Sequence, residues 1–342
     1  MLLTLKHSKK LGVALVGLGN YSQGQLGPAL LETEHCYLAG IVTSTKEKES
    51  IWAEKYNIKK ENIYNYDNFD SIANNHEIDI VYVVLPNSMH AEYTIRAAKA
   101  GKHVICEKPM AISVSECEKM IEACDKAGKK LAIGYRLHYD PFNIELMRLG
   151  QNRVYDRPMD ISTNFSFVLK DSKKWRTQKD LAGGGPLMDL GIYCIQASLY
   201  TFGELPTSLW AKNITRDNDF FKDIEGTIEW EITFPFGKAY GKTSFTIVNT
   251  PKGKIELRPS FFYGGIKATT PDGSMDFKPV NQQALQMDAF ALDVIENRDS
   301  LVPGEMGMRD NYLIEKIYES AANGGEVVTL EDIPKVLDLR KL

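Results

Sequence analysis

Three residue types able to move a proton lie in two short stretches of this 342-residue chain. Lys108 stands between an acid and a proline in "HVICEKP", and Asp189 and Tyr193 stand four residues apart in "MDLGIYC". On a helix, that spacing places the acid and the phenol on one face. A neutral phenol is a poor base at neutral pH, but a nearby ammonium group stabilises its phenolate form. Together the three side chains predict proton exchange with a substrate hydroxyl group.

Each of these residues also has an ordinary structural interpretation. Most lysines are exposed, so Lys108 would simply open a loop. Tyr193 would be a core aromatic with a satisfied hydroxyl group, and Asp189 would pair with a nearby base. The residue types alone leave both interpretations open.

A glycine motif, "VGLGNYS", follows the first apolar run of the chain. Gly17 and Gly19 permit a tight turn and close approach to a pyrophosphate, which the next helix N-terminus, at Asn20 and Tyr21, would hold. Ser22 stands where the usual third glycine is expected. The context after a strand favours dinucleotide binding, and a plain glycine turn is the alternative.

The end of the next apolar run, "IVTSTKEKES", bears on the choice of dinucleotide. NAD-binding folds commonly place a carboxylate here, whereas this chain has Thr43 and Ser44, with Lys48 shortly after. Hydroxyl groups and a cation suit a 2′-phosphate, so NADP is the predicted cofactor and NAD is the alternative. Equally, Glu47 and Glu49 would neutralise the lysine in an ordinary solvated loop.

Two further strand ends belong to the same predicted edge, because ligands of open α/β sheets lie beyond the carboxyl ends of the strands. Pro109 restricts Lys108, and the Lys108–Pro109 bond is a candidate for the cis form. The other residues predicted at these ends are Leu85, Pro86, Asn87, His90 and Glu107.

Hydrophobic periodicity divides the chain into two parts. Up to about residue 133, short β-branched runs alternate with helical stretches, which predicts a parallel sheet with helices on both faces. Ser113 and Glu116 form a possible capping box, with Gly128 at the helix end. We therefore predict an α/β protein with an N-terminal Rossmann (doubly wound parallel sheet) domain over residues 1–134.

After residue 135 the periodicity changes. A helix is predicted from Pro186 to Gly203, and further helices at 282–296 and 307–323. In "GTIEWEITF" apolar and polar residues alternate, as in an antiparallel sheet with one buried face. Residues 135–342 are therefore predicted to form a C-terminal α/β domain with a large, mostly antiparallel open sheet.

Composition excludes several classes of protein. The formal net charge of -4 gives no electrostatic reason to bind nucleic acid or an anionic membrane. No apolar run is long enough to span a bilayer, and the start "MLLTLKHSKK" lacks the ordered regions of a secretory signal, so a cytoplasmic location is expected. The five cysteines and six histidines are scattered, which predicts reduced thiols and no metal site.

Longer motifs resemble one enzyme family. "LPNSMHAEYTIRAAKAGKHVICEKPMA", "GYRLHYDPFN" and above all "AGGGPLMDLGIY" are similar to the glucose-fructose oxidoreductase / inositol dehydrogenase (Gfo/Idh/MocA) family, and most to its glucose-fructose oxidoreductase branch. The likeness runs from about residue 11 to 325. It implies nicotinamide-dependent oxidation or reduction of a sugar between the two domains.

The resemblance also assigns roles to residues. It implies that Lys108 is the catalytic-site lysine, Asp189 the acid that orients the sugar, and Tyr193 the proton-transfer residue. Lys48 becomes the partner of the 2′-phosphate. Four further residues match positions around the cofactor or the cleft: Glu107, Arg136, Trp175 and Arg176.

The family implies a homodimer or homotetramer that packs through the open sheet. Only about ten residues precede the first predicted strand, so a cofactor-retaining N-terminal arm is not expected. Two alternative functions are a non-enzymatic NADP-binding sensor and an NAD-dependent glycosidase of the same family. A proton-transfer set argues against the sensor, which has no need of one.

Overall fold

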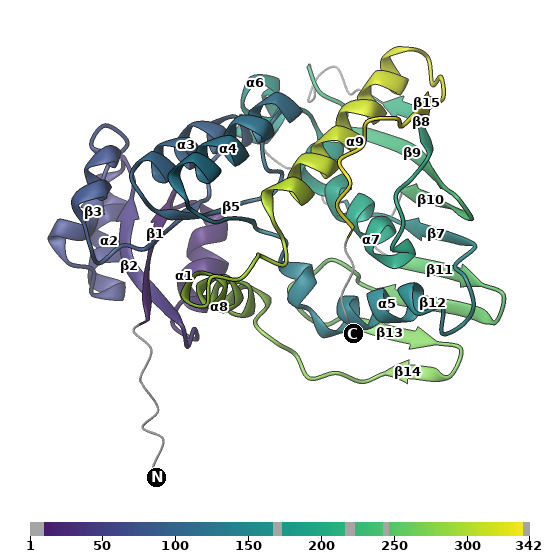
Figure 1. Ribbon diagram of the computed structural model, residues 1–342, viewed down its shortest axis with the longest axis horizontal. Coiled ribbons are helices and arrows are strands. Elements are labelled where there is room, and N and C mark those ends of the chain that lie inside the picture. Colours follow the sequence, from purple (N-terminus) through teal and green to yellow (C-terminus); the bar gives the residue numbers. More distant parts are fainter. Residues whose placement is uncertain (1–9, 167–172, 216–222, 242–245, 338–342) are drawn as a thin grey trace, which may run out of the picture.

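The protein is described by a computed structural model that covers residues 10–166, 173–215, 223–241 and 246–337. Two sheets stand side by side with helices packed on and between them (Figure 1). The residues of "MLLTLKHSKK" that precede Lys10 lie outside the described part. Within the described residues, no helix has both the length and the apolar character needed to cross a membrane.

The first sheet is parallel throughout, in the order β3-β2-β1-β4-β5-β6, which is the doubly wound arrangement predicted from the alternation of strands and helices. Five of its strands, β1, β2, β4, β5 and β6, coincide with the short β-branched runs "LGVALVGLG", "CYLAGIVT", "DIVYVVLP", "HVICE" and "KLAIGY". The two-residue β3 is too short to show a hydrophobic period. The strands are β1 (Leu11–Val16), β2 (Cys36–Val42), β3 (Ile63–Tyr64), β4 (Ile80–Val83), β5 (His103–Cys106) and β6 (Leu131–Ile133).

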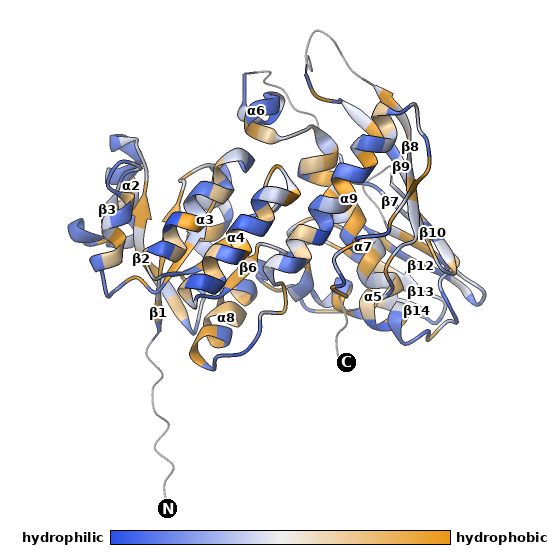
Figure 2. Ribbon diagram, turned by 45° about the horizontal axis from the view of Figure 1, so that its top comes forward, coloured by the Kyte–Doolittle hydropathy of each residue, from blue (hydrophilic) through white to orange (hydrophobic). Residues whose placement is uncertain are grey.

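Helices cover both faces of this sheet. α3 (His90–Lys99) and α4 (Val114–Ala127) pack together on one face, while α1 (Gly27–Ala29) lies on the other; α2 (Lys46–Tyr56) follows β2 (Figure 1). The predicted caps of α4 are confirmed, because Ser113 accepts a hydrogen bond from the Glu116 N–H and Gly128 has a φ of 62°. Polar residues line the outward faces of these helices, and apolar residues line the strands (Figure 2).

The second sheet has the order β14-β13-β12-β11-β7-β10-β9-β8-β15, and among its described strands every pair is antiparallel except β7 with β10. Its strands are β7 (Asp160–Thr163), β8 (Ser208–Thr215), β9 (Thr227–Phe234), β10 (Gly237–Gly241), β11 (Thr246–Thr250), β12 (Gly253–Arg258), β13 (Lys267–Thr270), β14 (Gly273–Met275) and β15 (Val328–Thr329). The mostly antiparallel sheet predicted from the sequence is therefore confirmed.

Three helices, α5 (Pro141–Gln151), α7 (Ile192–Phe202) and α9 (Gly304–Ala322), cover one face of this sheet (Figure 1). The alternation in β9 holds, with Trp230, Ile232 and Phe234 buried. Glu231 departs from it: it lies on the polar face but is only 5% exposed, because Lys238 pairs with it at 2.7 Å.

The chain crosses back to the first sheet near its end. α8 (Gln282–Ile295) lies beside α1 and β2 although it follows all strands from β7 to β14 in sequence (Figure 1). Asp288 fixes it there by accepting hydrogen bonds from the backbone N–H groups of Glu34 and His35, both at 2.8 Å. Packing therefore joins residues on both sides of the predicted boundary at 134/135.

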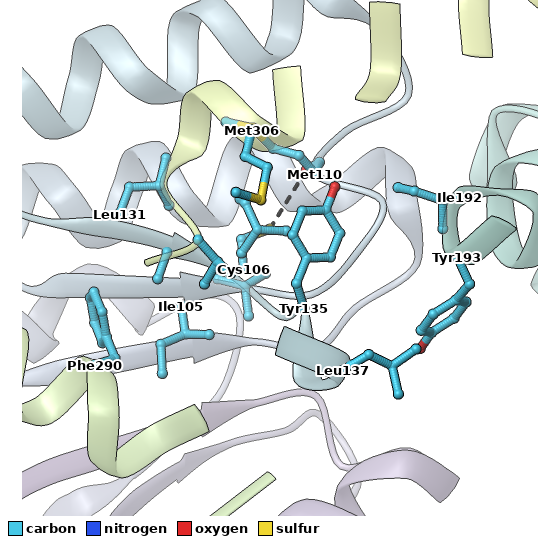
Figure 3. Packing of buried hydrophobic residues seen from close by; sticks show 14 of the residues in the cluster. Ile105, Cys106, Met110, Leu131, Tyr135, Leu137, Ile192, Tyr193, Phe290 and Met306 are labelled. Atoms are coloured by element: carbon cyan, nitrogen blue, oxygen red, sulfur yellow. Dashed lines mark hydrogen bonds between the residues drawn. The ribbon is translucent and has the colours of Figure 1, made fainter. Parts of the chain in front are cut away.

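Buried apolar side chains run without a break from the first sheet to α7. Figure 3 shows Ile105, Tyr135 and Met306 in this cluster, with Tyr193 beside Leu137 at one end. All five cysteines are buried free thiols, as predicted. The site residues that follow β5 are therefore anchored on a well packed support.

Candidate functional site

Lys108 lies just beyond β5, in a loop held by a cis Lys108–Pro109 bond, as the sequence suggested. Its ammonium group donates to the Asp189 backbone oxygen at 2.7 Å and to the carboxylate oxygen Oδ1 at 3.0 Å. Both side chains are largely buried, with 12% and 16% of the side chain exposed. A loop of the first domain therefore meets a helix of the second at this pair.

Asp189 is held by two cations, because Arg176 Nε donates to its other oxygen, Oδ2, at 2.9 Å. Burial by itself raises the pKa of a carboxyl group, but here Lys108 and Arg176 outweigh it and lower the pKa of Asp189 to about 2. The carboxylate is thus ionised at every physiological pH. Each of its oxygens keeps a lone pair for a further donor.

Lys108 is held in its charged form by the same contacts. Burial acts to lower the pKa of this lysine, but Asp189, Tyr193 and Glu107 together raise it above the ordinary value. A lysine that stays protonated acts as a positive charge and a hydrogen-bond donor, and it does not act as a base.

Tyr193 lies next to this ion pair and is 7% exposed. The Lys108 ammonium lies 4.9 Å from the centre of its ring, and the Arg136 guanidinium lies 5.2 Å from it. Phe165 and Phe261 pack against the same ring, with centroids 5.4 and 6.0 Å away. The ring is therefore both a packed aromatic, as its ordinary interpretation had it, and the neighbour of two cations.

The helix that carries Asp189 and Tyr193 begins with a π-helical turn, Leu187–Gly191, and continues as α7, ending at Gly203 with a φ of 63°. Glu225, which is 4% exposed, holds the start of this turn by accepting hydrogen bonds from the N–H groups of Gly185 and Leu187, both at 3.1 Å. Tyr318 of α9 donates to the same carboxylate at 2.8 Å. These contacts position Asp189.

The glycine run before this helix is required for close packing. A Cβ atom on Gly184 would lie 2.2 Å from the Tyr318 hydroxyl oxygen, and one on Gly185 would lie 2.2 Å from the Glu225 carbonyl oxygen. Gly183 adopts a φ of 76°, which favours glycine. The "AGGG" motif is thus a tightly packed turn.

A pocket of about 70 Å³ opens beside Asp189. One part of its lining is polar and consists of Asp189, Arg176 and Asn87. The rest is mostly apolar and is formed by Trp175, Ala182, Gly184, Gly185, Pro186, Leu190, Ile224 and Gly226. Apolar walls with a few convergent polar groups are typical of a small-ligand site.

The glycine motif after β1 is built to admit a dinucleotide. Gly17 has a φ of 96°, and a Cβ there would lie 2.3 Å from the Val84 carbonyl oxygen, whereas a Cβ on Gly19 would meet nothing within 4 Å. Ser22 is fully buried and donates to the Gly17 carbonyl at 2.6 Å, so it stabilises the turn in place of the third glycine. The open side at Gly19 fits a pyrophosphate.

Tyr21 connects the glycine motif with the catalytic candidates. Its ring lies 6.2 Å from that of Tyr263, and burial raises its pKa well above the ordinary value. Glu107 and Tyr193 add to this rise. The structure thus brings Tyr21 toward Lys108 and Tyr193, although 87 residues separate Tyr21 from Lys108 in the sequence.

At the end of β2, Thr43 is 5% exposed and accepts a hydrogen bond from the Thr45 N–H. Ser44 and Lys48 are exposed. Lys46 pairs with Glu49 at 2.9 Å, whereas no carboxylate of the described residues pairs with Lys48. A glutamate of this segment therefore neutralises Lys46, as the solvated-loop interpretation expects. Lys48 is not neutralised in this way and remains available to bind a phosphate.

The residues that follow β4 are more buried than those at the end of β2. Leu85 packs against Gly17, and Asn87 donates to the Ala182 carbonyl at 2.8 Å, which links the two domains at the pocket. His90 is 1% exposed, and its two ring nitrogens face the carbonyls of Leu85 and Pro109 at 2.9 and 2.8 Å. His90 thus links the loop after β4 with the loop after β5, and Pro86 is half-buried.

Glu107 is buried beneath this edge and accepts a hydrogen bond from the Tyr82 hydroxyl at 2.6 Å. Gln286 of α8 donates to the same hydroxyl at 2.8 Å. Burial raises the pKa of Glu107, while Tyr82, Lys108 and Arg136 act to lower it. This network ties α8 to β4 and to the loop after β5 that carries Lys108.

Several residues of the site could not be predicted from the sequence. Glu225 and Tyr318 come from an irregular loop and from α9, where no motif marks them. Tyr263 and Gln282 contact Arg136, and no motif marks either residue in the sequence. Among the described residues, no group of histidine, cysteine, aspartate and glutamate could hold a metal ion.

Comparisons with known proteins agree with this architecture. Residues 11–135 match the family described as oxidoreductase family, NAD-binding Rossmann fold, and residues 146–256 match the GFO/IDH/MocA C-terminal domain. The structure of an aldose-aldose oxidoreductase from Caulobacter crescentus, complexed with glycerol, superimposes with a TM-score of 0.91. The two chains are 38% identical, over 94% of this chain and 100% of that one.

Two curated relatives are archaeal enzymes. The D-xylose 1-dehydrogenase [NADP(+)] of Haloarcula marismortui is 25% identical over 328 residues, or 90% of either chain. The D-xylose 1-dehydrogenase (NADP(+)) 2 of Haloferax volcanii is 28% identical over 313 residues, covering 88% of this chain and 94% of that one. The matches to both domains and the close structural relative show that this chain belongs to the Gfo/Idh/MocA family of oxidoreductases.

Proposed function

We propose that the protein is an NADP-dependent oxidoreductase that transfers hydride between nicotinamide and a CH–OH group of an aldose. The observation that carries this proposal is the contact of Lys108 with both Asp189 and the ring of Tyr193, beside a small pocket. Relatives named as aldose or xylose oxidoreductases support the substrate class. The names of the two archaeal relatives support NADP over NAD.

The residues of the chain divide the work as follows. Gly17, Gly19 and the helix start at Asn20 would hold the cofactor pyrophosphate, with Ser44 and Lys48 at the 2′-phosphate. When bound, the nicotinamide supplies the hydride acceptor or donor.

Proton transfer falls to the side chains beside the pocket. Tyr193 accepts the proton of the sugar hydroxyl in oxidation and returns one in reduction. Lys108 remains charged and donates a hydrogen bond to the sugar oxygen, and Asp189 holds Lys108 and Arg176 in position and accepts from a further sugar hydroxyl. Trp175 and Ile224 offer apolar surface to the sugar ring.

A spectroscopic assay tests this function. The purified protein is mixed with NADP or NAD and a panel of aldoses, and nicotinamide absorbance is followed; the same panel is run without added cofactor. Turnover by the wild type, with a loss of at least about 100-fold in Tyr193→Phe, is expected. Tyr66→Phe removes a hydroxyl group outside the site and serves as the matched control.

Other outcomes would decide against the proposal. Tight NADP binding without redox change for any aldose would favour a sensor, and release of a sugar from a glycoside would favour a glycosidase. A Tyr193→Phe variant with wild-type turnover would remove Tyr193 from the mechanism. Light scattering of the same sample measures whether the protein forms the homodimer or homotetramer that we propose to pack through the open sheet.

A further inference from the structure

Arg136 is a buried cation for which the described residues provide no carboxylate partner. It lies after β6 and is 2% exposed. Its guanidinium donates to the side-chain oxygen of Gln282 and to the carbonyls of Phe261 and Phe262. Its Nε is buried and has no hydrogen-bond partner among the described residues. All of these acceptors are neutral.

The other two cations of the site, Lys108 and Arg176, are each paired with a carboxylate. Lys108 and Arg176 share the carboxylate of Asp189, at 3.0 and 2.9 Å. Two carboxylates lie around Arg136 without pairing with it: the Arg136 charge acts to lower the pKa of Glu107, and Asp140 is one step removed, since Gln282 donates to it at 2.9 Å. A charge that is buried without a counterion is costly, and the cost is recovered when an anion forms beside it.

Aromatic rings occupy the position next to this cation. The guanidinium carbon lies 4.3 Å from the ring centre of Tyr263 and 5.2 Å from that of Tyr193. Burial acts to lower the pKa of Arg136, but Tyr193, Tyr21 and Tyr263 raise it above the ordinary value. Four ionisable groups interact electrostatically with Arg136, with Tyr193 or with both of them. These groups are Lys108, Glu107, Tyr21 and Tyr263.

We infer that Arg136 is a positioning residue whose unpaired positive charge stabilises the phenolate form of Tyr193. This inference rests on the proposed function. The phenolate accepts the hydroxyl proton during sugar oxidation, and it is left behind after proton donation during reduction. Lys108 and Arg176 are both bound to the Asp189 carboxylate, whereas Arg136, 5.2 Å from the Tyr193 ring centre, is paired with no carboxylate of the described residues and its positive charge acts on the phenolate directly.

Two variants separate charge from packing. Arg136→Lys keeps the charge, whereas Arg136→Met removes it at similar side-chain length. Turnover is measured from pH 5 to 10 with the preferred aldose, and NADPH fluorescence confirms that each variant is folded and binds cofactor. Arg148→Met, which removes a surface arginine paired with Glu145 on α5, is the matched control and should behave as wild type.

We expect kcat to be about 100-fold lower in Arg136→Met than in wild type. The loss of activity at acidic pH should begin about one pH unit or more higher than in wild type. Arg136→Lys should stay within about tenfold of wild type, with an unchanged profile. In Arg136→Ala, guanidinium ions in the millimolar range should restore activity, whereas urea, a neutral molecule of similar shape, should not.

Three results would overturn the inference. Equal losses in the lysine and methionine variants with wild-type pH profiles would show that Arg136 only packs the site, and so would a change confined to KM. Rescue by urea as well as by guanidinium would show that shape and not charge is required. Absence of turnover in the wild type, or full activity of Tyr193→Phe, would overturn the proposed function and this inference with it.

Discussion

At the scale of single residues, the candidate site depends on the balance of charge around Asp189. One carboxylate is shared by Lys108 and Arg176, and this sharing keeps the acid ionised and the lysine protonated. In the proposed reaction the chemistry is therefore divided: one ion pair is fixed in charge across the physiological range, and the tyrosine beside it would exchange the proton.

Asp189→Asn is expected to lower kcat by about 100-fold or more, because Lys108 loses the anion that positions it. It should also destabilise the fold by about 3 kcal/mol at pH 7, since two cations are left without a partner. Folding lowers the pKa of Asp189 to about 2. The carboxylate therefore contributes its full stabilisation at pH values above the pKa of the unfolded state, which is about 4.

This contribution is lost as the pH falls through 2. Denaturant titrations of wild type and Asp189→Asn across pH should thus show a constant difference in the free energy of unfolding above about pH 5. The difference should shrink below about pH 4. A difference that did not change with pH would contradict the ion-pair account.

Lys48→Met is expected to raise KM for NADP about fivefold and to leave KM for NAD nearly unchanged. Lys48 is exposed at the start of α2 with no carboxylate partner in the described chain, and one exposed charge contact with phosphate is worth about 1 kcal/mol. Steady-state kinetics with both cofactors make the comparison, and Lys55→Met at the far end of α2 is the control. Equal KM changes for both cofactors would exclude a 2′-phosphate contact.

At the scale of elements, the start of the helix that carries Asp189 and Tyr193 is held by side chains from two other elements. Glu225 bonds the first N–H groups of the turn, and Tyr318 of α9 bonds Glu225. The glycines before the turn let these partners approach.

Gly185→Ala is therefore expected to lower kcat more than tenfold and to lower the melting temperature by several degrees. The added methyl group would lie 2.2 Å from the backbone oxygen of Glu225, so the turn must move and Asp189 with it. Gly24→Ala, where a Cβ meets nothing within 4 Å, should be neutral or slightly stabilising. Kinetics and thermal denaturation of both variants test this, and equal behaviour of the two would contradict it.

At the scale of the whole molecule, segments distant in sequence hold the two domains together. α8 returns to the first sheet, where Asp288 binds two backbone N–H groups before β2. Asn87 bonds the Ala182 carbonyl, and Gln286 reaches Tyr82. The edge of the first sheet and the pocket of the second domain are thereby kept in register.

Asp288→Ala should lower the free energy of unfolding by about 2 to 3 kcal/mol, because two charge-assisted hydrogen bonds are lost. It should raise KM for the cofactor more than it lowers kcat, since α8 also bears on Tyr21 through Gln283. Chemical denaturation and cofactor titration measure both effects. A change of less than about 0.5 kcal/mol would show that α8 is held by apolar packing alone.

The sequence by itself determined the fold class, most strands of the first sheet, the caps of α4 and the helix ending at Gly203, because local periodicity and terminal residues specify such elements. It also singled out Lys108, Asp189 and Tyr193. Only the tertiary structure decided which partners share Asp189, that Arg136 forms no ion pair with a carboxylate of the described residues, and that Glu225, Tyr318 and Gln282 belong to the site. These contacts join residues from 13 to 146 positions apart, and local pattern carries no information on such pairs.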